Sequence, residues 1–184
     1  MKKVSLIFMV LLSQFFISCS SDNSSSSNPS STNVGFSMKV NGVDCTLCTP
    51  INNGTIFWKK FTNNDGSHSY SLVALFSRNG DNNLNNQVKF VFKTENLLPN
   101  QIFPVSPLYT PTDPITWITI VDGGAGRLYN ANTNSTGQIK ITQFDGVTMS
   151  GTFSFSHLNE YTNYSTLPFI DITDGVFTNV PVAN

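Results

Sequence analysis

Charged residues are scarce in this 184-residue chain. Lysine, arginine, aspartate and glutamate make up 11% of it, and the formal net charge is −1, whereas an ordinary soluble protein carries about 25% charged residues. So little charge cannot build the basic face that nucleic-acid binding needs, and we expect no nucleic-acid partner. Coiled coils and helical bundles are excluded because they are rich in glutamate, lysine, alanine and leucine. The hydrophobic share of 39% is enough to bury a core, which excludes a disordered chain.

Residues of the kind that form catalytic sites are few and stand in no recognisable motif. The chain has two histidines, His68 and His157, and two glutamates, Glu95 and Glu160. We expect both histidines to be solvated turn residues, because His68 follows a predicted hairpin turn and His157 ends a predicted strand. There is no G-x-S-x-G nucleophile motif, and spacing assigns no pair of carboxylates to glycosidase chemistry. We therefore predict no catalytic residue, no cofactor and no enzymatic activity.

The N-terminal segment has the features of a secretory signal. Two lysines precede an apolar run from Val4 to Ile17, which is too short for the roughly 20 helical residues that span a bilayer. The run leads into Phe16-Ile17-Ser18-Cys19, which resembles the lipobox of bacterial lipoproteins. That resemblance implies cleavage before Cys19 and acylation of this residue, and two or more acyl chains hold a protein at a membrane. We predict a signal peptide over residues 1–18 and lipidation of Cys19; an ordinary signal peptide with a chance cysteine is the alternative.

A flexible tether is expected to follow, so that residues 19–33 hold the lipidated cysteine and a serine-rich linker. Ser20–Asn33 contains no large apolar side chain that could order it, and a linker of this length spans roughly 20 Å. Its start is similar to the acidic surface-export signals of Bacteroidetes lipoproteins, although it holds a single acid, Asp22. We expect the protein at the outer membrane, facing the periplasm or the cell surface.

Alternating strand patterns dominate residues 34–184, which we expect to form a single β-domain. Apolar side chains recur at every second position in Gln87–Lys93, Gln138–Thr142 and Val147–Phe155, and this period places one face of a strand in a core. The core face of the last stretch is expected to hold Val147, Met149, Phe153 and Phe155. Two more continuously apolar stretches are predicted to be central strands, Ser69–Phe76 and Thr116–Val121.

Turn dipeptides separate the strand patterns. Asn41-Gly42 and Asp145-Gly146 stand between apolar stretches and suit two-residue hairpins. Further turns are predicted at Asn53-Gly54, Asp65-Gly66, Asn79-Gly80, Asp122-Gly123-Gly124 and Asp174-Gly175. The proline-rich stretch Pro99–Pro114 is expected to be a loop or an interrupted edge. The number of turns predicts an all-β fold of about nine or ten strands, as a single antiparallel β-sandwich or a partly closed barrel.

Two cysteines close together, Cys45 and Cys48, leave three alternatives open. Outside the cytoplasm such a pair tends to form a disulfide, but Cα atoms three residues apart in an extended strand lie roughly 10 Å from each other, beyond disulfide reach. A bridge therefore needs a turn there, which Thr49-Pro50 makes plausible. The second alternative is a pair of thiols. A redox or zinc site is the third, although zinc needs about four ligands and the chain offers no second C-x-x-C.

Other polar and aromatic residues have an ordinary structural interpretation and a functional one. Asn79–Asn83 and Asp122-Gly123-Gly124 could offer oxygens to calcium, but they lack the spacing of an EF-hand, so we expect turns and no metal site. Six aromatic residues could stack on sugars but are more often core residues in β-proteins: Trp58, Trp117, Tyr109, Tyr129, Tyr161 and Tyr164.

Three stretches together resemble a protein family. They are Val40-Asn41-Gly42, the run from Gly137 through Asp145 to the strand Ser150–Phe155, and Asp174–Pro181. This combination is similar to uncharacterised lipoprotein domains of Bacteroidetes, whose C-terminal halves carry an I-S-G-T-F-S-F strand and a final G-x-F strand. The resemblance covers about Val34–Val182. It implies an all-β lipoprotein domain and carries over no activity and no catalytic residues.

The leading hypothesis is a non-enzymatic β-domain that is held at the membrane by a lipid anchor and binds or supports an envelope protein or another partner. The second hypothesis is a module that binds a carbohydrate or another small ligand through exposed aromatics or a barrel mouth. The third is a redox protein that uses Cys45 and Cys48.

Overall fold

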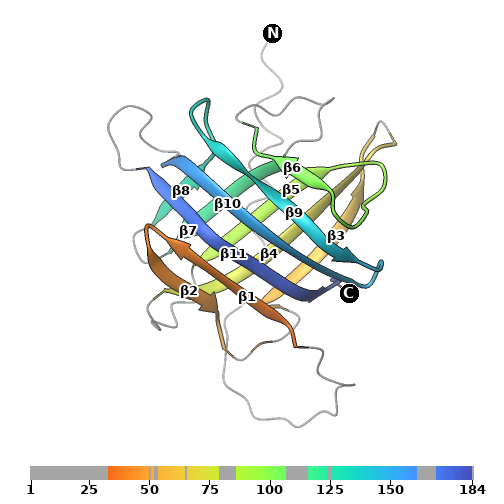
Figure 1. Cartoon of the computed structure of the whole chain (residues 1–184), viewed down its shortest axis with the longest axis horizontal. Coiled ribbons are helices and arrows are strands. Elements are labelled where there is room, and N and C mark those ends of the chain that lie inside the picture. Colours follow the sequence, from red (N-terminus) through yellow and green to blue (C-terminus); the bar gives the residue numbers. More distant parts are fainter. Residues whose placement is uncertain are drawn as a thin grey trace, which may run out of the picture.

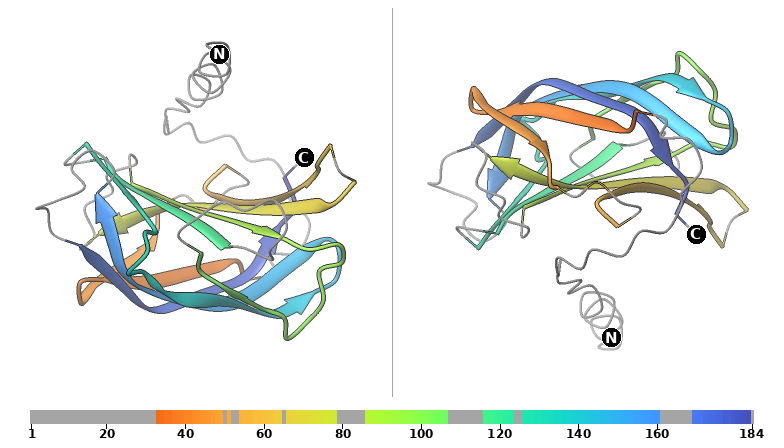
Figure 2. Two further views of the ribbon diagram at one scale, coloured as in Figure 1. Left: turned by 90° about the horizontal axis from the view of Figure 1, so that it is seen from above. Right: turned by 90° about the horizontal axis from the view of Figure 1, so that it is seen from below.

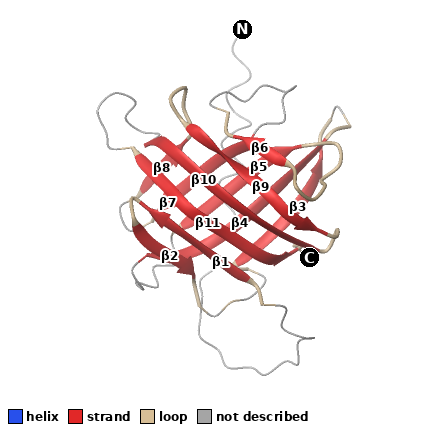
Figure 3. Cartoon of the chain, viewed as in Figure 1, coloured by secondary structure: helices blue, strands red, loops and turns tan. Residues whose placement is uncertain are grey.

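The computed structural model describes residues 33–49, 51, 54–64, 66–78, 86–106, 116–123, 126–160 and 169–183, and every regular element in these ranges is a β-strand (Figures 1 and 3). The strands are β1 (Gly35–Val40), β2 (Val43–Leu47), β3 (Ile56–Thr62), β4 (His68–Arg78), β5 (Gln87–Lys93), β6 (Ile102–Pro104), β7 (Thr116–Asp122), β8 (Arg127–Asn130), β9 (Thr136–Phe144), β10 (Thr148–Glu160) and β11 (Ile170–Pro181).

Eight of the eleven strands close into an antiparallel barrel. The ring runs β11-β1-β2-β4-β5-β7-β8-β10 and returns to β11, while β9 and β6 extend from β10 and β3 pairs with β4. Seen edge-on, the molecule has two curved layers that join at the sides (Figure 2). The prediction of an all-β, partly closed barrel is therefore confirmed. Within the described ranges no helix has the length and apolar character of a membrane span.

Ring closure depends on β10 changing its neighbour. Through Ser156 it pairs with β9, and at Asn159 and Glu160 it pairs with β8 instead. Between the two partners lies His157 in a left-handed conformation with φ 57°, where the register with β11 also shifts. Such a bulge bends a strand and increases its twist. The expectation that His157 ends the strand is wrong, because the chain bends there and continues to Glu160.

A second change of neighbour occurs on β4. This strand pairs with β3 from His68 to Ala74 and with β2 from Phe76 to Arg78. At the change, the Leu75 N–H donates to the Thr55 carbonyl at 2.8 Å and the Leu75 carbonyl accepts from the Cys48 N–H at 3.1 Å. The backbone groups of this transition are therefore satisfied, as buried backbone must be.

Aromatic side chains fill the interior from both layers. The Phe90 ring from β5 lies 4.7 Å from the Phe153 ring of β10, measured between centroids. Towards the end of the barrel that carries β3, β9 and β6, the Trp58 ring lies 5.3 Å from Phe144, and Phe92 lies 4.7 Å from Phe103. Such pairs add to the free energy of burying large apolar surfaces. The interior is a packed core.

Glycines opposite phenylalanines make close packing possible between β10 and β11. Gly175 pairs with Phe153, and Gly151 pairs with Phe177. A Cβ on Gly175 would lie 2.5 Å from atoms of the Phe153 ring, and a Cβ on Gly151 would overlap both the Phe177 ring and the carbonyl oxygen of Lys140. Each phenylalanine ring therefore covers the space that the opposite glycine leaves, a known way to retain glycine in a strand.

This packing corrects the turn that was predicted at Asp174-Gly175. The two residues lie inside β11, which runs on to Pro181. A glycine that follows an aspartate is a strong turn signal when only neighbours in the sequence are considered. Here Gly175 is required by a ring on the adjacent strand, which local sequence does not reveal.

The turn dipeptides at the two hairpins behave differently. Asn41 and Gly42 both have positive φ, at 50° and 78°, so the predicted two-residue hairpin between β1 and β2 is confirmed. The hairpin between β9 and β10 has three loop residues, Asp145 to Val147, instead of two. Val147 is consequently exposed and does not lie on the core face, as was expected.

Asp145 holds this longer loop together. Its Oδ1 accepts from the N–H groups of Thr148 at 2.6 Å and Val147 at 2.8 Å, and its Oδ2 accepts from the Thr148 hydroxyl at 3.0 Å. The backbone donors, that of Thr148 first, lower the pKa of the Asp145 carboxyl below its ordinary value.

The remaining strand predictions are confirmed with small shifts at the ends. β5 has the predicted bounds, β7 ends one residue later than expected, and β4 extends the predicted stretch at both ends. Within the described part of the proline-rich stretch, β6 forms a three-residue edge strand against β9.

We predict that Gly151→Ala and Gly175→Ala each lower the free energy of unfolding by about 1–3 kcal/mol, the usual cost of overpacking a core. Gly35→Ala is the matched control, because a Cβ there meets its nearest atoms at an ordinary 3.8 Å. We expect it to change stability by less than about 0.5 kcal/mol. Equilibrium denaturation in urea measures all three variants, and equal effects at Gly35 and Gly175 would contradict this account.

Candidate functional site

At one end of the barrel, the inward-facing positions beyond the last core residues carry charged side chains. We call this end the mouth. Along β4, Phe76 is buried and Arg78 follows two residues later on the same face; along β7, Ile120 and Asp122 do the same. On β8 the order is reversed, so that Arg127 precedes the buried Tyr129. Because side chains alternate along a strand, these charged residues point towards the inside of the barrel end.

The charges around the mouth alternate in sign. Arg78 lies 3.9 Å from the Asp122 carboxylate, and Arg127 lies 3.8 Å from the Glu160 carboxylate on β10. Following the ring from β4 through β7 and β8 to β10, the order is positive, negative, positive and negative. We call these four residues the charged rim. Its formal charge is zero.

Glu160 is the most buried member of the charged rim, and Arg127 is the most exposed. The side chain of Glu160 is 10% exposed, and it pairs across the strands with Tyr129. A hydrogen bond with Tyr129, followed by smaller contributions from Glu160 and Asp122, raises the pKa of Arg127 above its usual value. The guanidinium is thus a permanent cation and donor.

Beneath the charged rim the mouth encloses a pocket of about 180 Å³. Its apolar floor consists of Val40, Phe76, Ile120 and Ile170, all less than 9% exposed. Asn86, itself 4% exposed, also lines the pocket, and its Oδ1 accepts from the Gly123 N–H at 3.1 Å. An apolar floor with a few convergent polar groups is the usual composition of a small-ligand site.

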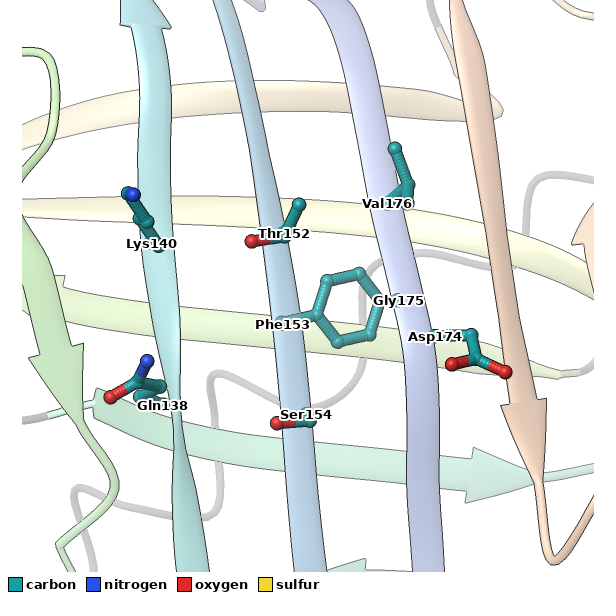
Figure 4. Close-up of a pocket in the computed structure, with 8 residues that line it drawn as sticks. All are labelled: Gln138, Lys140, Thr152, Phe153, Ser154, Asp174, Gly175 and Val176. Atoms are coloured by element: carbon teal, nitrogen blue, oxygen red, sulfur yellow. The ribbon is translucent and has the colours of Figure 1, made fainter.

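A second hollow lies on the outer face of β9, β10 and β11. It is a wide, open groove of about 390 Å³. Figure 4 shows its residues on three adjacent strands, with the Phe153 ring beside Gly175: Gln138, Lys140, Thr152, Phe153, Ser154, Asp174, Gly175 and Val176.

The groove has weaker means of holding a ligand than the mouth. Phe153 is 4% exposed and belongs to the core, so the groove offers no exposed aromatic ring for stacking. Asp174 is engaged by Lys39 at 3.0 Å, which raises the pKa of that lysine through the hydrogen bond first and the opposite charge second. Both side chains are well exposed, and such surface pairs contribute little.

Three residue types of a hydrolytic triad meet at the bulge in β10, but not in a catalytic arrangement. The Ser135 hydroxyl donates to the His157 carbonyl oxygen at 2.6 Å, and the Asp171 carboxylate accepts from the His157 N–H at 2.9 Å. Both contacts involve the His157 backbone, while the imidazole stacks on Phe169 with 4.2 Å between centroids. A general base must face the hydroxyl through its ring nitrogen. The three residues hold the bulge in place.

Cys45 and Cys48 are both buried, each with 1% exposure. They are thiols in this structure, and Cys45 Sγ donates to the Val43 carbonyl at 3.6 Å. The chain passes through them in strand geometry, because Cys45 and Leu47 pair with β4 and the Cys48 N–H bonds to Leu75. This path favours the alternative with two thiols; the disulfide stays a prediction.

The other residues proposed from sequence divide into three groups. Trp58 and Tyr129 are core residues, 3% and 4% exposed. The expectation that His68 is a solvated turn residue is wrong, because it is the first residue of β4, pairs with Thr62 and is half-buried, with Nδ1 at 3.4 Å from the Thr62 hydroxyl. The rest lie outside the described residues: Cys19, Asn79–Asn83, Tyr109, Tyr161, Tyr164 and the side chain of Trp117. Within the described ranges, no three His, Cys, Asp or Glu side chains gather to hold a metal.

Sequence analysis did not identify the charged rim. Its members stand far apart in the chain, and closure of the barrel brings them together. A local signal exists, since Arg78, Asp122 and Arg127 each stand two positions from an inward-facing residue of a strand.

A family model described as "Domain of unknown function (DUF6252)" matches residues 108–181. This range contains two of the three stretches that carry the resemblance to uncharacterised domains, Gly137–Phe155 and Asp174–Pro181, while Val40-Asn41-Gly42 lies outside it. Comparison with curated proteins and with solved structures gave no match.

We predict that the full chain with Cys19→Ala contains two thiols that react with Ellman's reagent only after unfolding. Burial protects Cys45 and Cys48 in the folded state. Titration is done before and after denaturation, without reductant. Fast reaction in the folded state would contradict the burial, and no reaction after denaturation would establish the disulfide instead.

Proposed function

We propose that this chain is a lipid-anchored β-barrel of the bacterial outer membrane, with a non-enzymatic role in binding. The observation that carries the proposal is the order of three segments: an apolar leader that ends at Cys19, a serine-rich tether, and a closed barrel with a pocket at one end that is lined by polar and apolar groups. The match to an uncharacterised domain family over residues 108–181 is compatible with this role.

The position of the mouth relative to the tether supports a binding role. The tether joins the barrel at the start of β1, where the Asn33 carbonyl accepts from the Asn179 side chain at 3.4 Å. β1 then runs beside β11 to Val40 (Figure 1), and Val40 and Asn41 line the mouth. Six strand residues span about 20 Å. The mouth therefore lies at the other end of β1 from the point where the tether is attached.

The redox alternative has less support. Reactive cysteines need access to solvent and a lowered pKa, whereas Cys45 and Cys48 are buried beside the change of partner on β4. Their contacts there are those of residues that stabilise the fold.

We predict that Cys19→Ala abolishes acyl labelling and moves the protein out of the membrane fraction, because no other cysteine lies at the end of the leader. Metabolic labelling with an alkyne fatty acid and fractionation of cells measure both effects. Cys45→Ala is the matched control and should keep the label and the membrane association. Unchanged retention of the Cys19→Ala chain would refute the anchor.

A further inference from the structure

The charged rim and the pocket beneath it have a chemistry that selects one class of ligand. Arg78 and Arg127 supply only donors, and Asp122 and Glu160 supply only acceptors. Arg78, Asp122 and Arg127 line the pocket, so a ligand that reaches these three groups must both donate and accept at neighbouring positions. Hydroxyl groups do this, since each has one donor and two acceptor sites.

The balance of charge at the mouth disfavours an anionic ligand. Each arginine has a carboxylate within 4 Å, so an anion that approaches either guanidinium also faces a negative group. A cation meets the same conflict with the arginines. A neutral ligand whose hydroxyls bridge an arginine and a carboxylate gains from both without net repulsion.

The floor of the mouth indicates the shape of that ligand. Phe76, Ile120 and Ile170 are apolar and lie below the charged rim. The pocket of about 180 Å³ is smaller than the ~300–1,000 Å³ of sites that hold drug-sized ligands. Such a volume accepts one ring and not a longer chain. A pyranose ring has an apolar C–H face for the floor and hydroxyls around its edge for the charged rim.

We propose that the mouth binds a single neutral pyranose, the terminal sugar of a glycan, with Arg78, Asp122 and Arg127 bonded to its hydroxyls and Glu160 holding Arg127 in place. This proposal rests on the binding role proposed above and specifies the class of ligand that is bound. It does not depend on the lipid anchor.

Saturation-transfer difference NMR on the full chain tests the proposal, in a detergent without a sugar headgroup. The probes are methyl β-D-glucopyranoside, methyl β-D-galactopyranoside and methyl α-D-mannopyranoside, with glucuronate and inorganic phosphate as anionic comparisons. We expect at least one methyl pyranoside to bind with a Kd on the order of 1 mM, as suits a ligand of this size. Both anions should bind more weakly.

Arg127→Gln should weaken the binding of that sugar about tenfold, the effect of losing a charged hydrogen bond. Lys140→Gln is the matched control: it removes one positive charge from the outer groove and should leave the Kd unchanged. The thermal transition of each variant is measured, and Arg78→Gln replaces Arg127→Gln should the latter fail to fold.

Three results would overturn the proposal: no saturation transfer to any of the three pyranosides, tighter binding of an anion than of the sugars, or a Kd that the arginine variant leaves unchanged. None of these bears on the anchor, because acyl labelling of Cys19 is measured separately. Loss of the anchor with intact sugar binding would in turn refute only the membrane role.

Discussion

The fold depends on the close approach of β10 and β11, where two phenylalanine rings cover two glycines. Phe153 lies over Gly175 and Phe177 over Gly151, and a side chain at either glycine would push the strands apart. The Phe153 ring also stacks on Phe36 at 5.7 Å and lies 4.7 Å from Phe90 on the opposite layer. The same packing thus joins neighbouring strands and the two layers. Interiors packed this densely transmit any change in volume.

The mouth follows from how the ring closes. β10 leaves β9 at the His157 bulge and joins β8, and β4 leaves β3 and joins β2. These two changes of partner bring eight strand ends together on one side. At the other end, the aromatic residues around Trp58 and Phe144 fill the space. The pocket lies at the end where, among the described residues, the inward-facing positions carry charge instead of apolar groups.

Local patterns predicted most strands, and features that depend on distant residues were missed. Alternation placed β5 correctly, and Asn41-Gly42 identified its hairpin, because both are short-range effects. Asp174-Gly175 was misassigned because the ring that needs Gly175 comes from another strand. For the same reason, local patterns place single members of the charged rim on inward-facing positions but do not group them, because these strand ends meet only when the ring is closed.

The central claim is that Gly175 is required by the Phe153 ring, and a double-mutant cycle tests it most directly. The free energy of unfolding is measured for the parent chain, Gly175→Ala, Phe153→Leu and the double variant. A smaller side chain at position 153 removes part of the clash, although the Phe153 carbonyl still lies 2.5 Å from the added Cβ. We predict that Gly175→Ala costs at least about 0.5 kcal/mol less when leucine replaces Phe153, as for residues in contact. An equal cost in both backgrounds would contradict the account.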